Sequence, residues 1–248
     1  MSYSERSHDI LDYLKSHKSA SIDELARLLY VSEATIRRDL TSMQKLGLIE
    51  RSHGGAILSE GSDELSFFIR QTKNAKEKMR TATIALNYLP EFQTVFIDNS
   101  STCLALANRL NLSHKTIVTN GLQLAVHMHD RDVTSLILLG GEISGHTTAT
   151  LGGITLSSIR DFRFDLALLS CAAVDAEGSY EPSIETMQIK RAAMENSRRK
   201  VLIFDGTKIN ERAPYHTADL NAYDTIITDA EDEKLEAVRA VHPNIYNK

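Results

Sequence analysis

Residues 32–46 carry side chains of two kinds at the spacing of opposite helix faces. One face is small, polar and mostly basic, and holds Ala34, Arg37, Arg38, Thr41 and Lys45. The other face is apolar and holds Ile36, Leu40, Met43 and Leu46. Basic and polar side chains on a helix can hydrogen-bond to base edges in the major groove and pair with phosphates. The spacing therefore predicts a helix that packs on a core with one side and contacts duplex DNA with the other.

The predicted DNA contacts divide into base-reading and backbone-binding side chains. Recognition helices enter the groove by their N-terminal end, so the first residues lie closest to the bases. We assign base reading to Glu33, Ala34, Thr35 and Arg37, and phosphate binding to Arg38 and Lys45. With the helix start and the following hairpin, the expected DNA contacts are Ser32, Glu33, Ala34, Thr35, Arg37, Arg38, Thr41, Lys45, Arg51, His53 and Gly54.

Capping signals define the elements that hold this helix. Ser21 and Glu24 have the spacing of a capping box, which predicts a helix over residues 22–29. Ser32 is a typical N-cap for the next helix. Gly47 stands where a left-handed C-cap ends such a helix.

A hairpin and an earlier helix complete the predicted N-terminal domain. Strand-like runs at 48–51 and 56–58 flank a Gly-Gly tip, which suits a hairpin turn. A helix around residues 5–16 supplies further apolar side chains for a three-helix core, namely Ile10, Leu11 and Leu14. The order of these elements predicts a winged helix-turn-helix DNA-binding domain over residues 1–58.

The same residues resemble the N-terminal signature of the DeoR family of bacterial transcriptional regulators. The resemblance spans nearly all of residues 1–58, and its most specific part is the run Thr35-Ile36-Arg37-Arg38-Asp39-Leu40. It also includes Arg6, Ile10, Ser32, Leu46, Arg51, His53, Gly54, Gly55 and Ala56. The resemblance implies a repressor with a C-terminal sensor domain for phosphorylated sugars.

Apolar runs alternate with helical patterns in the rest of the chain. The predicted strands lie at 94–97, 116–118, 135–139, 165–169, 200–204 and 224–227. Apolar strands separated by helices indicate a parallel sheet covered on both faces. We expect a linker and one connecting helix over 59–90, and an open, mostly parallel α/β domain over 91–248. The DeoR resemblance implies a sheet of the ribose-5-phosphate isomerase type.

Polar residues follow several of these strands, at the edge where open parallel sheets bind ligands. Hydroxyls and amides at a helix start can hold an anion, and the resemblance implies that residues 98–102 bind the effector phosphate. It also implies that other polar residues surround the sugar. Ser100 and Ser170 stand where the family usually has glycine. The expected effector contacts are Asp98, Ser100, Ser101, Thr102, Thr119, Asn120, Gly140, Gly141, Glu185, Lys190, Asp205 and Lys208.

The composition of the 248 residues is ordinary for a soluble globular protein, with 42% hydrophobic and 25% charged residues. No apolar run reaches membrane-spanning length, and the polar N-terminus lacks a signal-peptide core, so we expect a cytoplasmic protein with no membrane partner. The net charge is −5, yet basic residues outnumber acidic ones between Arg37 and His53. His127 and His129 face different ways on a helix, so no metal site is expected.

We expect a DNA-binding regulator, a repressor of a carbohydrate operon that a sugar phosphate controls, without cofactor or catalytic residues. It should be a homodimer or homotetramer, because one recognition helix reads too few base pairs. The alternative is a sugar-phosphate isomerase with an appended DNA-binding domain. Glu185, Lys190 and Asp205 would then serve as base, anion clamp and hydrogen-bond partner.

Overall fold

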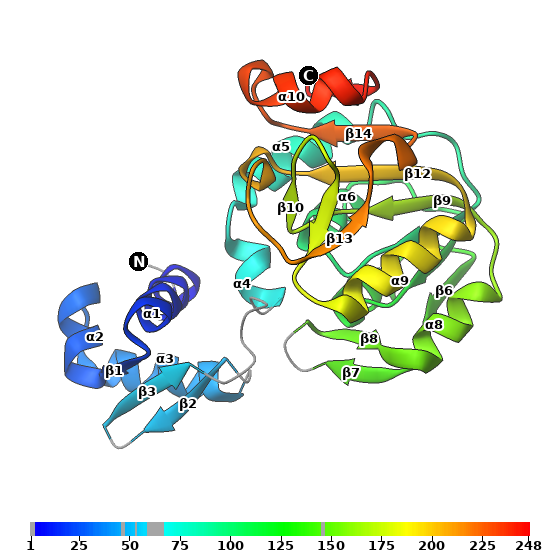
Figure 1. The fold of residues 1–248 in the computed structure, drawn as a ribbon. Helices are drawn as coiled ribbons and strands as arrows, with labels where there is room; N and C mark the ends of the chain where they lie inside the picture. Colours follow the sequence, from blue (N-terminus) through cyan, green and yellow to red (C-terminus); the bar gives the residue numbers. More distant parts are fainter. Residues whose placement is uncertain (1–2, 46–47, 53, 59–66, 145–146) are drawn as a thin grey trace. The chain divides into compact units, whose positions relative to one another are not determined.

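The computed structural model describes residues 3–45, 48–52, 54–58, 67–144 and 147–248, with the backbone alone for a few of them, Lys45 included. The chain divides into two compact units. The winged unit consists of Met1–Lys73 with Gly145–Thr147, and the sheet unit of Asn74–Ser144 with Thr148–Lys248. Figure 1 shows the elements of each unit along the chain.

The described part of the winged unit contains helices and a small antiparallel sheet. The helices are α1 (Tyr3–His17), α2 (Ile22–Leu29), α3 (Glu33–Lys45) and α4 (Phe67–Thr72). The strands are β1 (Ser19–Ser21), β2 (Ile49–Ser52) and β3 (Gly55–Leu58), in the order β1-β3-β2. Helices α1, α2 and α3 surround one apolar core, and its fully buried members include Ile10, Leu14, Leu25, Ile36, Leu40 and Met43.

The expected capping and turn chemistry is present in this unit. The Ser21 hydroxyl accepts from the Glu24 amide, and the Glu24 carboxylate accepts from the Ser21 amide at 2.7 Å. Gly54 forms the turn between β2 and β3 with φ +87°. A Cβ at Gly55 would lie 2.1 Å from the carbonyl oxygen of Ala20, so glycine is needed for β1 to pair with β3. Gly47, the expected C-cap of α3, lies outside the described residues.

The sheet unit contains one large sheet and two small ones. The large sheet consists of β4 (Thr94–Ile97), β5 (Thr116–Thr119), β6 (Ser135–Leu138), β9 (Phe164–Leu169), β12 (Ser197–Phe204), β14 (Thr225–Thr228) and β15 (Ile245–Tyr246). The small sheets consist of β7 (Glu142–Ser144) with β8 (Ala149–Leu151), and of β10 (Ala173–Val174), β11 (Ser179–Glu181) and β13 (Tyr215–Ala218). The helices are α5 (Ala75–Ala85), α6 (Ser101–Ala107), α7 (Leu122–Met128), α8 (Gly152–Arg160), α9 (Ile184–Glu195) and α10 (Asp232–Val241), with 3₁₀ turns η1 (Gly206–Lys208) and η2 (Leu220–Ala222).

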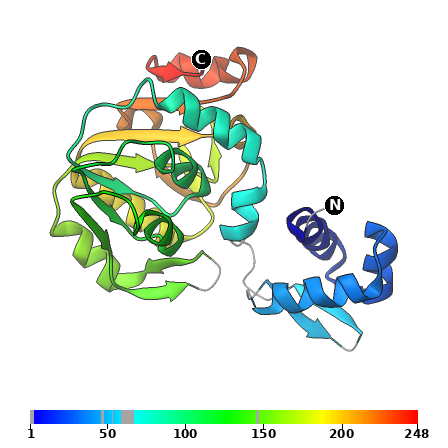
Figure 2. The same cartoon turned by 180° about the vertical axis from the view of Figure 1, so that it is seen from behind.

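All pairings in the large sheet are parallel, in the order β15-β14-β12-β9-β4-β5-β6. From β4 the chain adds β5 and β6 on one side, and then returns to add β9 and the later strands on the other. Helices α8 and α9 cover one face in Figure 1, and α5, α6 and α7 cover the other in Figure 2. The expected open parallel α/β fold is confirmed, with its topological switch point between β4 and β9.

The local structure differs from the sequence prediction in three places. The single connecting helix is two helices, α4 and α5, because Asn74 between them is left-handed at φ +55°. Helix α8 begins at Gly152, four residues before the helical pattern of residues 156–162 predicts its start. The small sheets were not predicted, because strands of two to four residues are too short to show the alternation of apolar and polar residues that indicates a strand.

Candidate DNA-binding surface and effector site

Helix α3 has the two faces that its sequence predicts. Ile36, Leu40 and Met43 are fully buried, whereas Arg37 and Arg38 are exposed. Ser32 caps the helix, since its hydroxyl accepts from the Thr35 amide at 3.2 Å. The polar face therefore stays open to a partner while the apolar face fixes the helix to the core.

The exposed residues of α3 are already organised without DNA. The Glu33 carboxylate and the Arg37 guanidinium form an ion pair at 2.9 Å one helical turn apart, and both side chains are more than half exposed. Arg51 on β2 donates to the Thr41 hydroxyl at 3.5 Å, which brings the wing to the recognition helix. These contacts orient an exposed Arg37 and a half-buried Arg51.

The remaining expected DNA contacts lie on the same surface or outside the described residues. Ala34 and Gly54 are exposed, and Thr35 is half-buried with its hydroxyl 2.9 Å from that of Ser32. His53 and the side chain of Lys45 lie outside the described residues.

Arg6 of α1 holds α3 in place from the core side. Its Nε lies 2.6 Å from Asp39 Oδ2, and its Nη2 lies 3.0 Å from Asp39 Oδ1. Asp39 is buried. Such two-point pairing of guanidinium and carboxylate fixes orientation as well as distance, so α3 cannot rotate about its axis without breaking it.

The carboxyl ends of the central strands gather polar residues at the switch point. Asp98 follows β4, Ser170 follows β9 and Asp205 follows β12, and these three strands are neighbours in the sheet. Asp98 Oδ2 accepts from the Ser170 amide at 2.9 Å and thereby joins β4 to β9. All three residues are buried.

Lys190 of α9 points into this edge and is fully engaged there. Its Nζ lies 2.7 Å from the Ser170 carbonyl oxygen, 3.1 Å from Asp98 Oδ2, and in contact with Glu181 Oε1 at the end of β11. A lysine ammonium has three protons, and three acceptors surround this one. The cluster therefore holds one ammonium against two carboxylates, and Lys190 has no donor left for a phosphate.

Asp98 and Lys190 stabilise each other's charged forms in this cluster. Burial by itself would lower the pKa of Lys190, but Asp98 and Glu181 raise the pKa above the ordinary lysine value. Burial by itself would raise the pKa of Asp98, but Lys190 and the hydrogen bonds from Ser100 and Ser170 hold that pKa below its ordinary value. Each charge exists in the interior because the opposite charge lies beside it.

Ser100 and Ser170, where the resemblance led us to expect glycine, take part in the local hydrogen bonds. Ser100 has an ordinary extended backbone, with φ −78°, and its hydroxyl caps α6 by accepting from the Cys103 amide at 3.0 Å. Ser170 binds Asp98 through its amide and Lys190 through its carbonyl, and both contacts use the backbone alone. Neither serine strains the chain.

Within the described residues, two buried oxygen atoms at this edge lack a hydrogen-bond partner. Asp205 is fully buried, and its Oδ1 accepts from the Thr207 amide while its Oδ2 has no donor. Asn120, after β5, donates from Nδ2 to the Thr150 carbonyl, and its Oδ1 has no donor. A buried acceptor without a donor is costly, so both atoms mark places for a ligand hydroxyl or a water.

The other expected effector residues differ in accessibility. Ser101, Thr102 and Thr119 are buried, and the Thr119 hydroxyl accepts from the Gly121 amide at 3.0 Å. Gly140 and Glu185 are exposed. Lys208 and Gly141 are half-buried, and a Cβ at Gly141 would lie 2.0 Å from Thr155 Oγ1, so packing also accounts for that glycine.

Glu181 was not singled out from the sequence. It precedes Pro182 in a strand of three residues, and nothing in its spacing connects it with Lys190 nine positions later. Only the pairing of β11 between β10 and β13 brings its carboxylate to Lys190.

The edge is also connected to the start of α5, where the sheet unit begins. Asn74 donates from Nδ2 to Thr207 Oγ1 at 2.8 Å, and Thr207 Oγ1 in turn donates to Asp205 Oδ1. A second connection runs from the Gly206 amide to Asp229 Oδ1 at 2.8 Å, and Asp229 Oδ2 lies 3.8 Å from Arg80 of α5. The loop after β12 is thus tied to α5 at two points.

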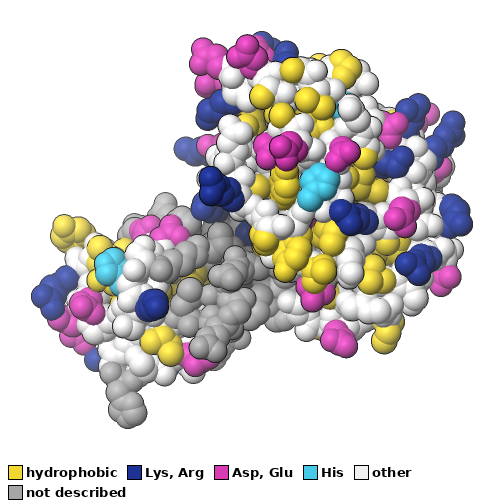
Figure 3. Space-filling view, viewed as in Figure 1, with side chains coloured by type: hydrophobic (Ala, Val, Ile, Leu, Met, Phe, Trp, Pro, Cys, Tyr) yellow, Lys and Arg dark blue, Asp and Glu magenta, His cyan; other side chains and the backbone are white. Residues whose placement is uncertain are grey.

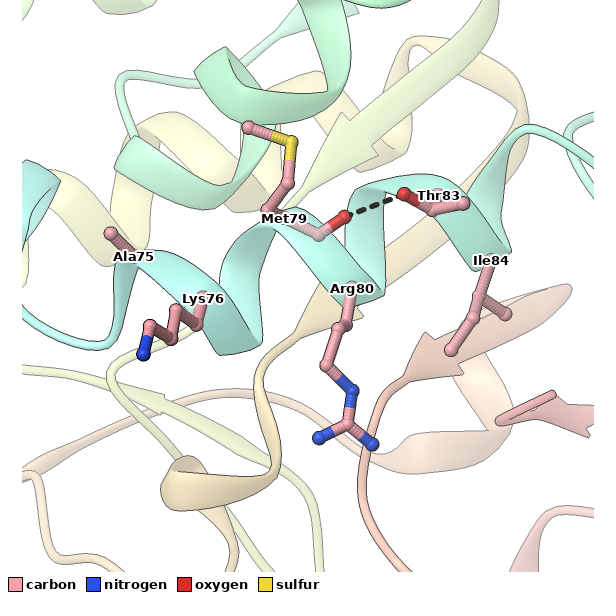
Figure 4. A pocket seen from close by; sticks show the side chains of 6 residues that line it. All are labelled: Ala75, Lys76, Met79, Arg80, Thr83 and Ile84. Carbon is pink, nitrogen blue, oxygen red and sulfur yellow. Dashed lines mark hydrogen bonds between the residues drawn. The ribbon is translucent and has the colours of Figure 1, made fainter.

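An open groove of about 590 Å³ lies along α5 itself. Figure 4 shows its lining, which consists of Ala75, Lys76, Met79, Arg80, Thr83 and Ile84. All of these belong to one helix and none follows a strand of the large sheet, so the groove does not coincide with the polar edge.

Charge on the sheet unit is mixed. Acidic and basic side chains are interspersed over the face seen in Figure 3, and no large basic patch covers that face. Among the described residues, no helix is long and apolar enough to cross a membrane.

Two family models and several curated proteins match the chain. The DeoR-like helix-turn-helix domain matches residues 6–61, and the DeoR C terminal sensor domain matches residues 73–230. The glycerol-3-phosphate regulon repressor of Escherichia coli (strain K12) is 34% identical over 232 residues, which cover 93% of this chain and 92% of that protein. The transcriptional regulator GlpR of Haloferax volcanii is 32% identical over 228 residues, which cover 91% of this chain and 89% of that protein. The repressor GlcR of Bacillus subtilis (strain 168) is 28% identical over 226 residues, which cover 91% of this chain and 88% of that protein.

Solved structures are less similar. Ribose 5-phosphate isomerase A of Methanocaldococcus jannaschii has a TM-score of 0.38 at 11% identity, over 55% of each chain.

Proposed function

The chain belongs to the DeoR family of transcriptional regulators, and from that premise we propose that α3 and the wing contact operator DNA while the edge at β4 and β9 binds a phosphorylated polyol or sugar. The two-faced burial of α3 supports the DNA contacts most directly. Its apolar side chains are fully buried, and its basic and polar ones are exposed. The contacts would be those predicted from the sequence, with Glu33, Ala34, Thr35 and Arg37 nearest the bases.

The chemistry of the edge supports a ligand rich in hydroxyl groups. Asp205 Oδ2 and Asn120 Oδ1 are buried acceptors without donors, and hydroxyl groups would supply them. Lys190 is saturated by its own chain, so we assign it the ordering of Asp98 and Glu181 rather than the phosphate. Lys208 and the hydroxyls of Ser101 and Thr102 are then the groups that we propose for the phosphate.

The loop after β12 offers a route from effector to DNA. A ligand hydroxyl on Asp205 Oδ2 would act on the carboxylate whose Oδ1 accepts from Thr207, and Thr207 holds Asn74 at the N-cap of α5. Asn74 begins the sheet unit, and the chain before it belongs to the winged unit. Thermodynamic linkage requires that an effector which lowers operator affinity bind the DNA-free state more tightly.

The names of the relatives suggest which candidate effectors should be tested first. One is named for the glycerol-3-phosphate regulon, so glycerol 3-phosphate joins pentose and hexose phosphates in the panel. We propose further that the protein acts in the cytoplasm as a homodimer or homotetramer, because a single recognition helix covers too few base pairs for specificity.

A two-step experiment tests the function. The full chain first selects duplexes from a randomised library, and the affinity for the selected duplex is then measured with and without each phosphate. We expect one phosphorylated compound to change that affinity by fivefold or more, within the ordinary range of about 5–150-fold for coupled sites. Failure to enrich any duplex would refute the DNA-binding role.

The isomerase alternative is tested on the same preparation. The buried set Asp98, Lys190 and Glu181 at the switch point is the observation that favours it, because it combines carboxylates with an ammonium. We expect no interconversion of pentose or hexose phosphates above the uncatalysed rate. Turnover that disappears in Asp98→Asn would show an enzyme instead.

A further inference from the structure

Tyr30 ends α2 in a conformation that suits glycine. Its backbone is left-handed, at φ 54° and ψ 41°. The Tyr30 amide donates to the Arg27 carbonyl at 3.4 Å, and the Val31 amide donates to the Ala26 carbonyl at 3.1 Å. This pair of bonds is a Schellman motif with Tyr30 at the position where glycine is most common, because a side chain there crowds its own backbone.

The Tyr30 side chain gains no packing in return for this conformation. The residue is 95% exposed, compared with 66% for Ile143, the next most exposed large apolar residue of the described chain. Val31, not Tyr30, packs against the core of the winged unit. A bulky side chain that strains its backbone and does not pack against the described part of its own chain often serves a binding partner.

The position of Tyr30 indicates which partner. It stands two residues before Ser32, which caps α3, and the exposed residues Glu33, Ala34 and Arg37 follow directly. In a helix-turn-helix unit the N-terminus of the second helix enters the major groove, so the turn just before it comes close to the sugar–phosphate wall of that groove. Tyrosine is among the side chains that hydrogen-bond to DNA phosphates.

We propose that Tyr30 is a DNA-backbone contact, with its hydroxyl donating to a phosphate beside the groove that α3 reads and its ring covering the adjoining deoxyribose. This rests on the DNA-binding role proposed above. Phosphate contacts carry no sequence information, so Tyr30 adds affinity for every duplex and positions α3 in the groove. The residue gives up some stability of the free fold for affinity in the complex.

Two variants separate strain from binding. In Tyr30→Gly the left-handed backbone is relaxed, and both the ring contact and the hydroxyl are lost, so Tm should stay the same or rise while DNA affinity falls by more than about tenfold. In Tyr30→Phe only the hydroxyl is lost, so affinity should fall about tenfold, the loss expected for one hydrogen bond to a charged group. For each variant, the factor by which affinity falls should be the same for the selected duplex and for a scrambled duplex of the same composition.

The dependence on salt identifies the kind of contact. A neutral hydroxyl releases no counterion, so Tyr30→Phe should leave the slope of log Kd against log salt unchanged, whereas Arg38→Gln should reduce it by about one. His114→Gly is the matched control, because His114 is also left-handed (φ 63°) and exposed but belongs to the sheet unit. It should bind DNA as the wild type does.

Three results would overturn the assignment. The first is that Tyr30→Gly binds DNA within twofold of the wild-type affinity. The second is that Tyr30→Phe binds DNA with the wild-type affinity. The third is that the Tm of Tyr30→Gly falls together with its DNA affinity. Wild-type binding and its loss in Arg37→Ala test the DNA-binding role separately, so failure of that role and failure of the Tyr30 contact can be distinguished.

Discussion

Arg6 and Asp39 form a two-point ion pair between α1 and α3, with Nε–Oδ2 at 2.6 Å and Nη2–Oδ1 at 3.0 Å. Arg6 is 13% exposed and Asp39 3% exposed at their side chains, so water screens the pair little. Asp39 belongs to the same helix as the exposed Arg37 and Arg38, but faces the core. The orientation of the exposed basic face of α3 thus depends on an ion pair on its core side.

Removal of one partner should unfold the winged unit more easily. We expect Asp39→Asn to destabilise it by about 3 kcal/mol, because the largely buried Arg6 guanidinium would lose the carboxylate charge beside it. Urea titration followed by circular dichroism measures this change. The double variant Arg6→Met with Asp39→Leu should recover most of the loss, since apolar side chains replace both charges. A double variant as unstable as the single one would contradict this explanation.

Loss of Arg37 should affect DNA binding alone. The side chain is 58% exposed and its pair with Glu33 is a surface pair, so Arg37→Ala should change stability by less than about 0.5 kcal/mol. Affinity for the selected duplex should fall about tenfold to a hundredfold if Arg37 reads a base. The control is Arg27→Ala on α2, which removes an exposed arginine paired in the same way with Asp23. Equal losses in the two variants would show a general charge effect rather than base reading.

The capping box of α2 should be visible in a titration. Hydrogen bonds from the Ser21 amide and hydroxyl hold the pKa of Glu24 below its ordinary value. Because the folded pKa is the lower one, this stabilisation is present above the ordinary glutamate pKa of about 4.3 and is lost as pH falls through the folded pKa. In Ser21→Ala the pKa of Glu24, followed by NMR of the carboxyl carbon, should rise. An unchanged midpoint would show that Ser21 does not hold the carboxylate in solution.

Because Asp205 has an unpartnered oxygen, its replacement should weaken effector binding without lowering the stability of the free protein. Asp205→Asn replaces a buried carboxylic side chain that has an unpartnered oxygen by an amide of the same shape, so the Tm of the free protein should stay the same or rise. The rise in Tm that the effector produces should shrink, corresponding to about tenfold weaker binding. Glu195→Gln, an exposed change at the far end of α9, is the control. A full effector response in Asp205→Asn would exclude Asp205 from the site.

The bond between Asn74 and Thr207 should matter for communication rather than for binding. In Asn74→Ala the hydrogen bond of 2.8 Å is lost, whereas Asp205 stays intact. We expect the effector to bind within about threefold of its wild-type affinity and to change operator affinity much less. Calorimetry of effector binding and anisotropy of labelled duplex measure the two quantities. Asn87→Ala, an exposed residue just past α5, is the control. An undiminished effector response in Asn74→Ala would exclude this route.

The winged unit could be predicted closely because its signals are local. Ser21 with Glu24, Ser32 with Thr35, and the period of Ile36 and Leu40 each lie within one or two helical turns. The parallel strands were also found, since buried strands are continuous apolar runs. Asn74 shows the limit of this approach: its side chain bonds to Thr207, 133 positions later, and a distant partner leaves no local signal.

The effector edge was only partly predictable for the same reason. Asp98 and Asp205 were found because they directly follow strands, and that position has a meaning in parallel sheets. Glu181 was missed, and with it the fact that Lys190 is saturated. The sequence predicted which residues lie near the edge. It did not predict which of them form ion pairs, because those pairs join side chains from β11, α9 and the end of β4.

The internal neutralisation of Lys190 has a consequence for how the fold comes apart. Its ammonium is satisfied by Asp98 after β4, Glu181 in β11 and the Ser170 carbonyl after β9, so three strands and α9 share one buried group of charges. Because breaking a buried ion pair is costly, these elements should unfold together rather than one at a time.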